Sequence, residues 1–424
     1  MTWLPKSVVC LSYYNRSRFR SDAFAAFLLS LQIFPLAIAI AVAIGVHPLY
    51  GVSCAAAAGL LVSIFGDSKI RVSAPNVILI AVASTIVARD GILGLCLSTL
   101  LAGVLLMFFA AIRLGAAIQV LPRPVAVGFT TGIAVLIISE QLPNCFGLSS
   151  QIPTDQVARG ALTVMRHVTH REPHALVLAL AALVTMVVCS KTLRHVPVSL
   201  IVVAVGALLV RVWHLPVPTV GAFHGSTVMF PMHLAGALRF DLFGRIIGPA
   251  FAIAVLVAIE SLQAMVVATG LTGESTDPNS ELILQGGANL TSAFVGGLPV
   301  SGVSSDTVEN VRLGAQTPVA GMLQAVFLVV FLTFVAQGVR FIPLPVISAL
   351  VLSSVFHMTN WREIHCLTKG PRFELVVWGA TSVLTIFADL PIAIAVGMFI
   401  GMFVYIRKLQ QPALARLVAR LRLW

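Results

Sequence analysis

The feature that most constrains this chain is a succession of long apolar stretches separated by short polar turns. The first of them, residues 24–46, contains no charged side chain. A helix needs about 20 apolar residues to cross a bilayer. A water-soluble fold could not bury so many such stretches, because 58% of the 424 residues are hydrophobic and only 10% are charged. The pattern therefore predicts an all-α membrane protein that crosses the bilayer many times.

The first apolar stretch favours a retained span over a targeting peptide. It is longer than the apolar core of a secretory signal peptide, and no obvious cleavage site follows it. About fourteen spans are expected in all, at residues 24–46, 50–65, 75–88, 92–112, 124–140, 174–192, 197–213, 244–268, 280–296, 303–313, 317–338, 343–357, 373–388 and 391–406.

Basic residues are distributed unevenly between the two sides that these spans predict. With a cytoplasmic N-terminus, nineteen of the 27 Lys and Arg residues fall on inner segments, as the positive-inside rule requires. We therefore expect a multi-pass protein of the plasma (inner) membrane with both termini in the cytoplasm. The net charge of +11 then needs no nucleic-acid partner. The six cysteines show neither metal spacing nor a disulfide framework.

Two of the predicted spans are too short to cross a bilayer as plain helices. They begin at Pro75 and Val303, and each follows a similar extended stretch, Val-Ser-Ala or Val-Ser-Gly. They are the third and the tenth span, at matching places in two halves of seven. Paired interrupted helices at such positions indicate the binding site of a secondary transporter. Two helix N-termini that meet would concentrate positive dipole ends and free amides, so this point favours an anion.

The residues around these two breaks are the candidate substrate ligands. Their hydroxyl, side-chain amide and backbone N–H groups can donate hydrogen bonds to an anion, although a serine at such a place also caps helices. The expected substrate-binding residues are Ser73, Ala74, Asn76, Ser301, Gly302, Val303, Ser304 and Ser305.

Several further motifs resemble those of the sulfate permease (SulP) family of anion transporters. The segment 122–133, PRPVAVGFTTGI, resembles the family's P-x-P-V-x-x-G-F-T-x-G-I stretch. The other matching segments are 259–262, 279–289, 296–314, 342–344, 361–363 and 388–390. Together they extend the resemblance from about residue 20 to about residue 408.

The resemblance implies a specific architecture. It implies two inverted repeats of seven spans, in which half-helices 3 and 10 are each preceded by a short extended strand. It implies a core domain, about 22–112 and 244–338, that moves as an elevator against a gate domain, about 122–213 and 343–408. Residues 1–21 would be a cytoplasmic N-terminal segment, and 409–424 a short basic cytoplasmic tail. Most family members carry a C-terminal STAS domain, which this sequence is expected to lack.

Glu260 is the candidate coupling residue. It lies inside an apolar run, where a carboxylate is costly and is therefore a functional candidate. In sodium-dependent relatives the matching acid helps to bind the cation with a hydroxyl four residues later, where this chain has Ala264. This departure favours H⁺ over Na⁺ as the coupling ion. The alternative is a neutral Glu260 bonded to the broken backbone of the tenth span.

Asp306 is the sharpest departure from the family pattern, because many members have an arginine there. Three consequences stay open: amides and hydroxyls alone hold the anion, Asp306 carries a proton, or the substrate is neutral or cationic. A structural alternative places Asp306 in a solvated vestibule. On the first span, relatives often have glutamine at the place of Leu36, and Gln32, one turn earlier, would partly replace that amide near the substrate.

These observations predict a secondary active transporter that moves a small anion, such as sulfate, bicarbonate or a dicarboxylate, by proton symport. No Walker A sequence and no nucleophile–base set stands out, which disfavours an ATP-driven pump and an enzyme. No cofactor or metal is expected. The expected partners are the anion, membrane lipid and, in a homodimer, a second copy. Two alternatives are a transporter of a neutral nucleobase-like solute using Glu260 and Asp306, and an uncoupled anion channel.

Overall fold

The computed structural model describes residues 5–119, 123–148, 173–192, 196–222, 240–274, 276–359, 361–370 and 372–387, with residues 396 and 399. The expected tail at 409–424, most of the last expected span and most of residues 143–173, between two expected spans, lie outside the described residues.

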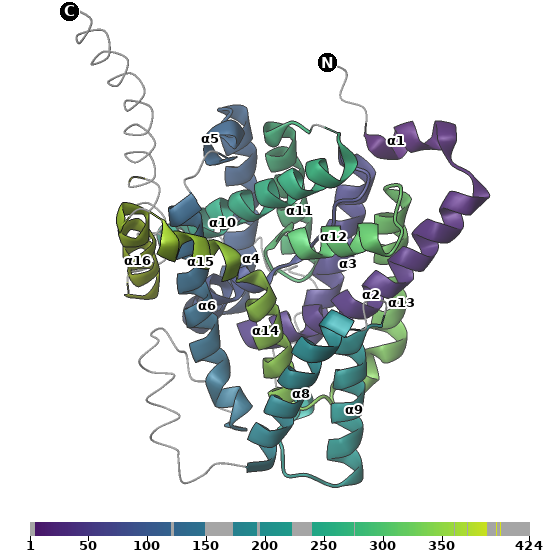
Figure 1. Cartoon of the computed structure of the whole chain (residues 1–424), viewed down its shortest axis with the longest axis vertical. Coiled ribbons are helices and arrows are strands. Elements are labelled where there is room, and N and C mark those ends of the chain that lie inside the picture. Colours follow the sequence, from purple (N-terminus) through teal and green to yellow (C-terminus); the bar gives the residue numbers. More distant parts are fainter. Residues whose placement is uncertain are drawn as a thin grey trace, which may run out of the picture. The chain divides into compact units, whose positions relative to one another are not determined.

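The described residues form helices and two short strands (Figure 1). The helices are α1 (Lys6–Cys10), α2 (Arg16–Ile44), α3 (Pro48–Phe65), α4 (Ile80–Ala111), α5 (Gly115–Gln119), α6 (Arg123–Cys145), α8 (Pro173–Thr192), α9 (Val198–Val212), α10 (Phe240–Thr272), α11 (Pro278–Val295), α12 (Ser304–Arg312), α13 (Val319–Val339), α14 (Leu344–Met358), α15 (Trp361–Lys369) and α16 (Arg372–Phe387). The strands are β1 (Ser73–Pro75) and β2 (Val300–Gly302).

Among the described helices, seven are long and apolar enough to cross a membrane. They are α2, α3, α4 with the 3-10 turn that precedes it, α6, α8, α10 and α13. The chain is therefore an integral, multi-pass membrane protein, as its sequence predicts. The fourteen spans, their inverted repeat and the core and gate domains stay predictions.

Local sequence signals set the ends of the first helices. The Asn15 side chain accepts a hydrogen bond from Arg18 N at 2.9 Å, so α2 begins within the segment expected to precede the membrane domain. The helix ends at Gly45, whose φ of 93° favours glycine. Gly91, at φ 69° and ψ −172°, breaks α4 between the two spans expected there. The short helices α1, α5 and α15 were not expected, because 5 to 9 residues are too few to form an apolar span.

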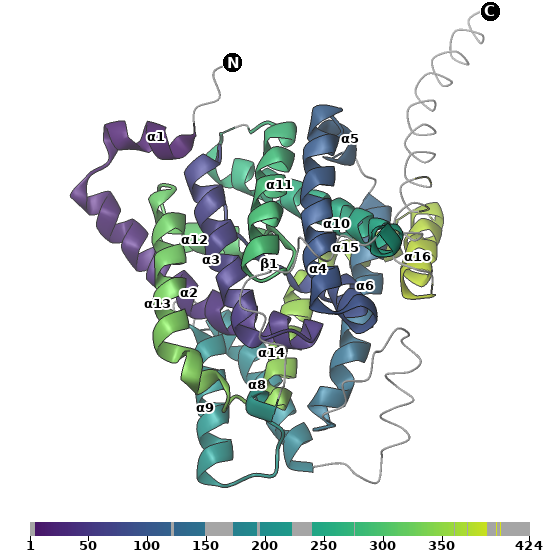
Figure 2. The same ribbon diagram turned by 180° about the vertical axis from the view of Figure 1, so that it is seen from behind.

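The described chain divides into two compact units, and the first contains residues 1–119 and 136–358. Within it α13, α3, α11 and α4 lie side by side in that order (Figure 2). Gly103 of α4 and Gly286 of α11 face each other, and a Cβ on either would lie 2.8 Å from the other's carbonyl oxygen. The two backbones can therefore approach closely, as small residues allow between membrane helices.

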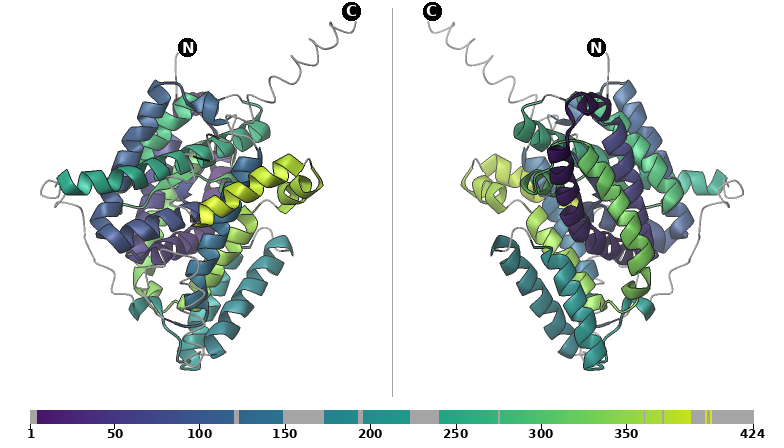
Figure 3. Two further views of the ribbon diagram at one scale, coloured as in Figure 1. Left: turned by 90° about the vertical axis from the view of Figure 1, so that its left-hand side faces the viewer. Right: turned by 90° about the vertical axis from the view of Figure 1, so that its right-hand side faces the viewer.

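Aromatic rings hold α2 against α13 in the same unit. The two helices run along each other, purple beside green in the right-hand view of Figure 3. Phe27 meets Phe327 edge to face at 5.5 Å between ring centroids, and Phe34 meets Phe331 at 5.7 Å. Edge-to-face pairs add to the stabilisation that burial alone gives.

The second unit contains residues 120–135 and 359–424, and it explains the GFTTG part of the family motif. A Cβ on Gly128 would lie 2.7 Å from the Trp378 carbonyl oxygen, and one on Gly132 would lie 2.5 Å from Thr385 Cβ. Ser382 Oγ donates to the Gly128 carbonyl at 2.9 Å. The two glycines, one helical turn apart, therefore let α6 pack closely on α16.

Candidate functional site

The two interrupted segments pair with each other. The strands β1 and β2 are antiparallel, with Ser73 opposite Gly302, Ala74 opposite Ser301 and Pro75 opposite Val300. The pairing continues where Val303 N donates to the Val72 carbonyl at 3.0 Å. A helix N-terminus follows each strand: a 3-10 turn (Val77–Leu79) and α4 follow β1, and α12 follows β2. The fold thus brings together the two breaks that the sequence singled out.

Asn76 connects the first helix end to a buried carboxyl group. Its Nδ2 donates to Glu260 Oε2 at 3.2 Å and to Ser301 Oγ at 3.1 Å. Its Oδ1 accepts from Ile78 N at 3.3 Å, which caps the turn and fixes which end of the amide faces Glu260. Both Nδ2 protons are therefore engaged here. Ser301 accepts from Asn76 and keeps its own hydroxyl proton to donate.

Helix α10 brings Glu260 to this point and packs directly on β2. Glu260 is 8% exposed, and its neighbour Ser261 accepts a hydrogen bond from Gly302 N at 2.9 Å. A Cβ on Gly302 would lie 3.2 Å from Ala264 Cβ. The close approach of strand and helix leaves little room for a side chain at position 302. We call Asn76, Ser301 and Glu260 the polar cluster.

The N-terminus of α12 carries an acidic side chain in its first turn. Val303 caps this helix without a side-chain hydrogen bond, so the first-turn amides have no side-chain acceptor at the cap. Ser304 is half-buried and Ser305 is exposed. Asp306 lies in the first turn and accepts a hydrogen bond from Ser305 Oγ at 3.2 Å. A carboxylate there offsets the positive end of the helix dipole that would otherwise attract an anion.

Gln32 and Leu36 lie on α2, and both are half-buried. This helix contacts β1 and α12, so it borders both halves of the paired segments. Within the part of the chain that the structure describes, no hydrogen bond joins Gln32 to the polar cluster. The role of these two residues as substrate ligands stays a prediction.

Ser73 is directed away from the polar cluster. Neighbouring residues of a strand present opposite faces, and Ser73 pairs with Gly302 while Ser301 pairs with Ala74. Ser73 is fully buried, and its Oγ accepts from Gln285 Nε2 of α11 at 2.8 Å. In the described arrangement its hydroxyl therefore belongs to the contact between β1 and α11.

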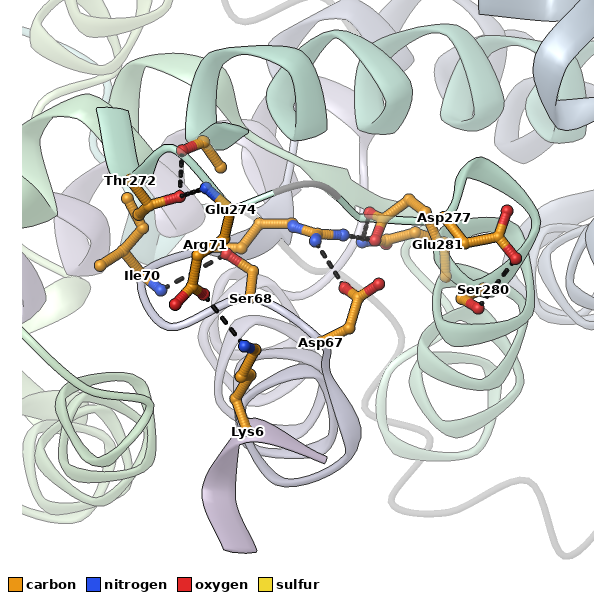
Figure 4. A network of polar contacts seen from close by, with 12 residues as sticks. Lys6, Asp67, Ser68, Ile70, Arg71, Thr272, Glu274, Asp277, Ser280 and Glu281 are labelled. Carbon is orange, nitrogen blue, oxygen red and sulfur yellow. Dashed lines mark hydrogen bonds and ion pairs between the residues drawn. The ribbon is translucent and has the colours of Figure 1, made fainter. Parts of the chain in front are cut away.

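The basic side chain closest in sequence to β1 is neutralised by two acids. The Arg71 side chain is 1% exposed; it pairs with Asp67 at 2.8 Å and with the fully buried Glu281 (Figure 4). Arg312 pairs with Glu309, three residues earlier on α12, at 3.7 Å. Among the described residues, no basic side chain bonds to the polar cluster.

A second charge network lies in the loops beside this pair. Lys6 and Lys69 contact Glu274 at 3.2 and 2.5 Å, and Figure 4 draws the Lys6 contact. Burial raises the pKa of the Glu274 carboxyl, but hydrogen bonds from Lys69 and Lys6 outweigh it and the pKa falls below its usual range. The hydrogen bond to Glu274 raises the pKa of Lys69. The network joins the N-terminal segment to the loops before β1 and α11.

Reasoning from the sequence missed several polar residues that hold the site. Glu281, Gln285 and Asn289 of α11 and Ser261 of α10 bind the strands or Arg71. A signal was present, because Glu281, Gln285 and Asn289 recur at i, i+4 and i+8, on one face of a helix. The sequence could not show which strand that face would meet.

The comparisons with known proteins identify the family and the fold. The family model described as Sulfate permease family matches residues 19–381. The chain is 28% identical over 403 residues to YvdB of Bacillus subtilis (strain 168), covering 94% of this chain and 76% of that protein. It is 26% identical over 394 residues to the bicarbonate transporter BicA of Picosynechococcus sp., covering 90% and 69%.

Two solved structures share the fold. The transmembrane domain of a cyanobacterial bicarbonate transporter, BicA, superposes with a TM-score of 0.80 at 23% identity, over 90% of this chain and 98% of that one. The murine Slc26a9 anion transporter, in the inward-facing state, gives 0.85 at 18% identity, over 96% and 71%.

The chain belongs to the sulfate permease family. It is a transporter rather than an enzyme.

Proposed function

We propose that this chain is a secondary active transporter that moves a small anion across the membrane by proton symport. The expected anions are sulfate, bicarbonate and dicarboxylates; the family description and the bicarbonate transporter among its relatives support this class. The observation that carries the proposal is the link from Glu260 through Asn76 to Ser301, where two helix N-termini meet.

Coupling follows from the charges at this point. An anion beside an ionised Glu260 is repelled, because like charges in a partly dehydrated site interact strongly. A proton on Glu260 removes the repulsion. The proton therefore raises the affinity for the anion, and the anion raises the affinity for the proton by the same factor. Transport would then proceed by elevator motion of the core against the gate, with both chain termini in the cytoplasm.

Liposome uptake tests this proposal. Purified protein is reconstituted, and labelled sulfate, bicarbonate and fumarate are supplied with and without an inward proton gradient. We expect faster uptake with the gradient, and loss of that stimulation in Glu260→Gln. The matched control is Glu140→Gln, which removes another membrane carboxylate, bonded to Ser84 at 3.2 Å. Uptake that ignores the gradient, or uncoupled currents that do not saturate, would contradict symport.

A second candidate is a transporter of a neutral, nucleobase-like solute. Asp306 favours it for two reasons. The acid offsets the positive end of the α12 dipole, which would otherwise attract an anion, and it can accept a hydrogen bond from a neutral solute. Thermal-shift binding of sulfate, bicarbonate, fumarate and uracil discriminates, since a bound ligand raises the melting temperature. Stabilisation by uracil alone would replace the anion proposal with this one.

A further inference from the structure

Helix α11 carries a stripe of polar side chains that has no role in the mechanism proposed above. The stripe consists of Glu281, Gln285, Asn289 and Ser292, at i, i+4, i+8 and i+11. All four are fully buried. Burying polar groups is costly unless each finds a partner, so the partners show what the stripe does.

The N-terminal half of the stripe binds the segment that contains β1. Glu281 pairs with Arg71, and Gln285 Nε2 donates to Ser73 Oγ at 2.8 Å. Arg71 and Ser73 are two residues apart, whereas Glu281 and Gln285 are four apart. Two residues along an extended chain and four along a helix both rise about 6 to 7 Å. The two elements therefore match in spacing, and this match fixes the register of β1 against α11.

The other half of the stripe binds β2 and the residues before it. Asn289 Oδ1 accepts from Val300 N at 3.0 Å, and its Nδ2 donates to the Val300 carbonyl at 2.8 Å. Ser292 Oγ donates to the Leu298 carbonyl at 2.5 Å. One helix thus holds both strands, and each strand leads directly into one of the two helix N-termini.

The Glu281 carboxylate fixes the orientation of the Gln285 amide, and this amide in turn binds the hydroxyl of Ser73. A carboxylate accepts hydrogen bonds only, so Gln285 must present Nε2, which donates to Glu281 Oε1 at 3.0 Å. The same nitrogen then donates to Ser73. Reversing the amide would lose the bond to Glu281 and set the amide oxygen against the carboxylate, so the buried pair determines the orientation of Gln285.

We propose that the polar stripe of α11 positions the two half-helix N-termini relative to each other and thereby sets which size of anion the site accepts. This inference rests on the proposed function. In the described residues the stripe makes no bond to Asn76, Ser301 or Glu260, so it acts through the strands. Removing the bonds of the stripe therefore changes the relative affinity for different anions and leaves the coupling of transport to protons in place.

The test compares Gln285→Met, which keeps the volume and removes both bonds, with Thr291→Val. Thr291 lies on the same helix, and among the described residues its hydroxyl bonds only to the Gly287 carbonyl of α11 itself. In liposomes, KM is measured for bicarbonate and for fumarate. A net hydrogen bond of about 1 kcal/mol corresponds to about a fivefold change in the ratio of the two KM values. We expect that change in Gln285→Met only, with unaltered stimulation by the proton gradient.

Two further measurements separate positioning from direct binding and from the proposed function itself. If Ser73 acts through Gln285, Ser73→Ala gives the same change and the double variant adds nothing; additive effects would assign Ser73 to the substrate. Should Gln285→Met fail to fold, Ser292→Ala, which removes the stripe's bond to the Leu298 carbonyl, takes its place in the test. Amide hydrogen exchange of 70–76 and 298–304 should rise in Gln285→Met, whether or not the wild type carries either anion. Unchanged exchange and an unchanged KM ratio would overturn the inference, whereas absence of wild-type transport counts only against the proposed function.

Discussion

Replacement of Glu281 by glutamine should destabilise the protein strongly, although the two side chains have nearly the same shape. The substitution leaves the Arg71 guanidinium, 1% exposed, without its buried partner. Breaking a buried ion pair from one side costs about 3–5 kcal/mol. Asp67 still pairs with Arg71 at 2.8 Å, so we place the loss at the lower end, about 3 kcal/mol.

A loss of about 3 kcal/mol lowers the folded-to-unfolded ratio by about 150-fold. Reversible unfolding in mixed micelles, followed by tryptophan fluorescence, measures it. Glu309→Gln is the matched control, because its partner Arg312 is 66% exposed. Exposed pairs contribute about 0–1 kcal/mol.

The double variant Arg71→Met, Glu281→Met adds a second control. It removes both buried charges, so it should recover part of the loss. A strong stabilising role for the Arg71–Glu281 pair is refuted if Glu281→Gln unfolds like Glu309→Gln, or if the double variant is less stable than Glu281→Gln alone.

Three further predictions concern the site and the loops. Asn76→Thr keeps a helix-capping side chain but loses the amide bridge, so it should retain the fold and lose at least about tenfold in anion affinity, measured by uptake. Asp306→Asn should raise the affinity for divalent sulfate more than for bicarbonate at low salt, because it restores the positive end of α12; equal changes would refute this. The lowered pKa of Glu274 contributes stability above the carboxyl's unfolded pKa, and this is lost as the pH falls through the lower folded pKa. Melting temperatures from pH 7 to 3 should therefore fall less steeply in Glu274→Gln.

Much of the fold could be read from the sequence because the bilayer imposes a simple rule. A span must be apolar over a fixed length, so α2, α3, α10 and α13 are visible as apolar runs. The breaks before Asn76 and Ser304 were also visible, since polar backbone at membrane depth needs a protein partner. The boundaries differed where short-range signals acted, as when Asn15 capped α2 ahead of the apolar run.

The sequence alone determined that this chain spans a membrane many times and that two of its segments are interrupted at a candidate site. Both features depend on the local composition of short stretches of residues, which the sequence shows directly. Only the tertiary structure decided the partners: Asn76 bridges Glu260 and Ser301, while Ser73 joins the stripe of α11. A hydrogen bond depends on direction and on a distance of about 3 Å. Such contacts arise only when β1 pairs with β2 and helices distant in sequence pack on both.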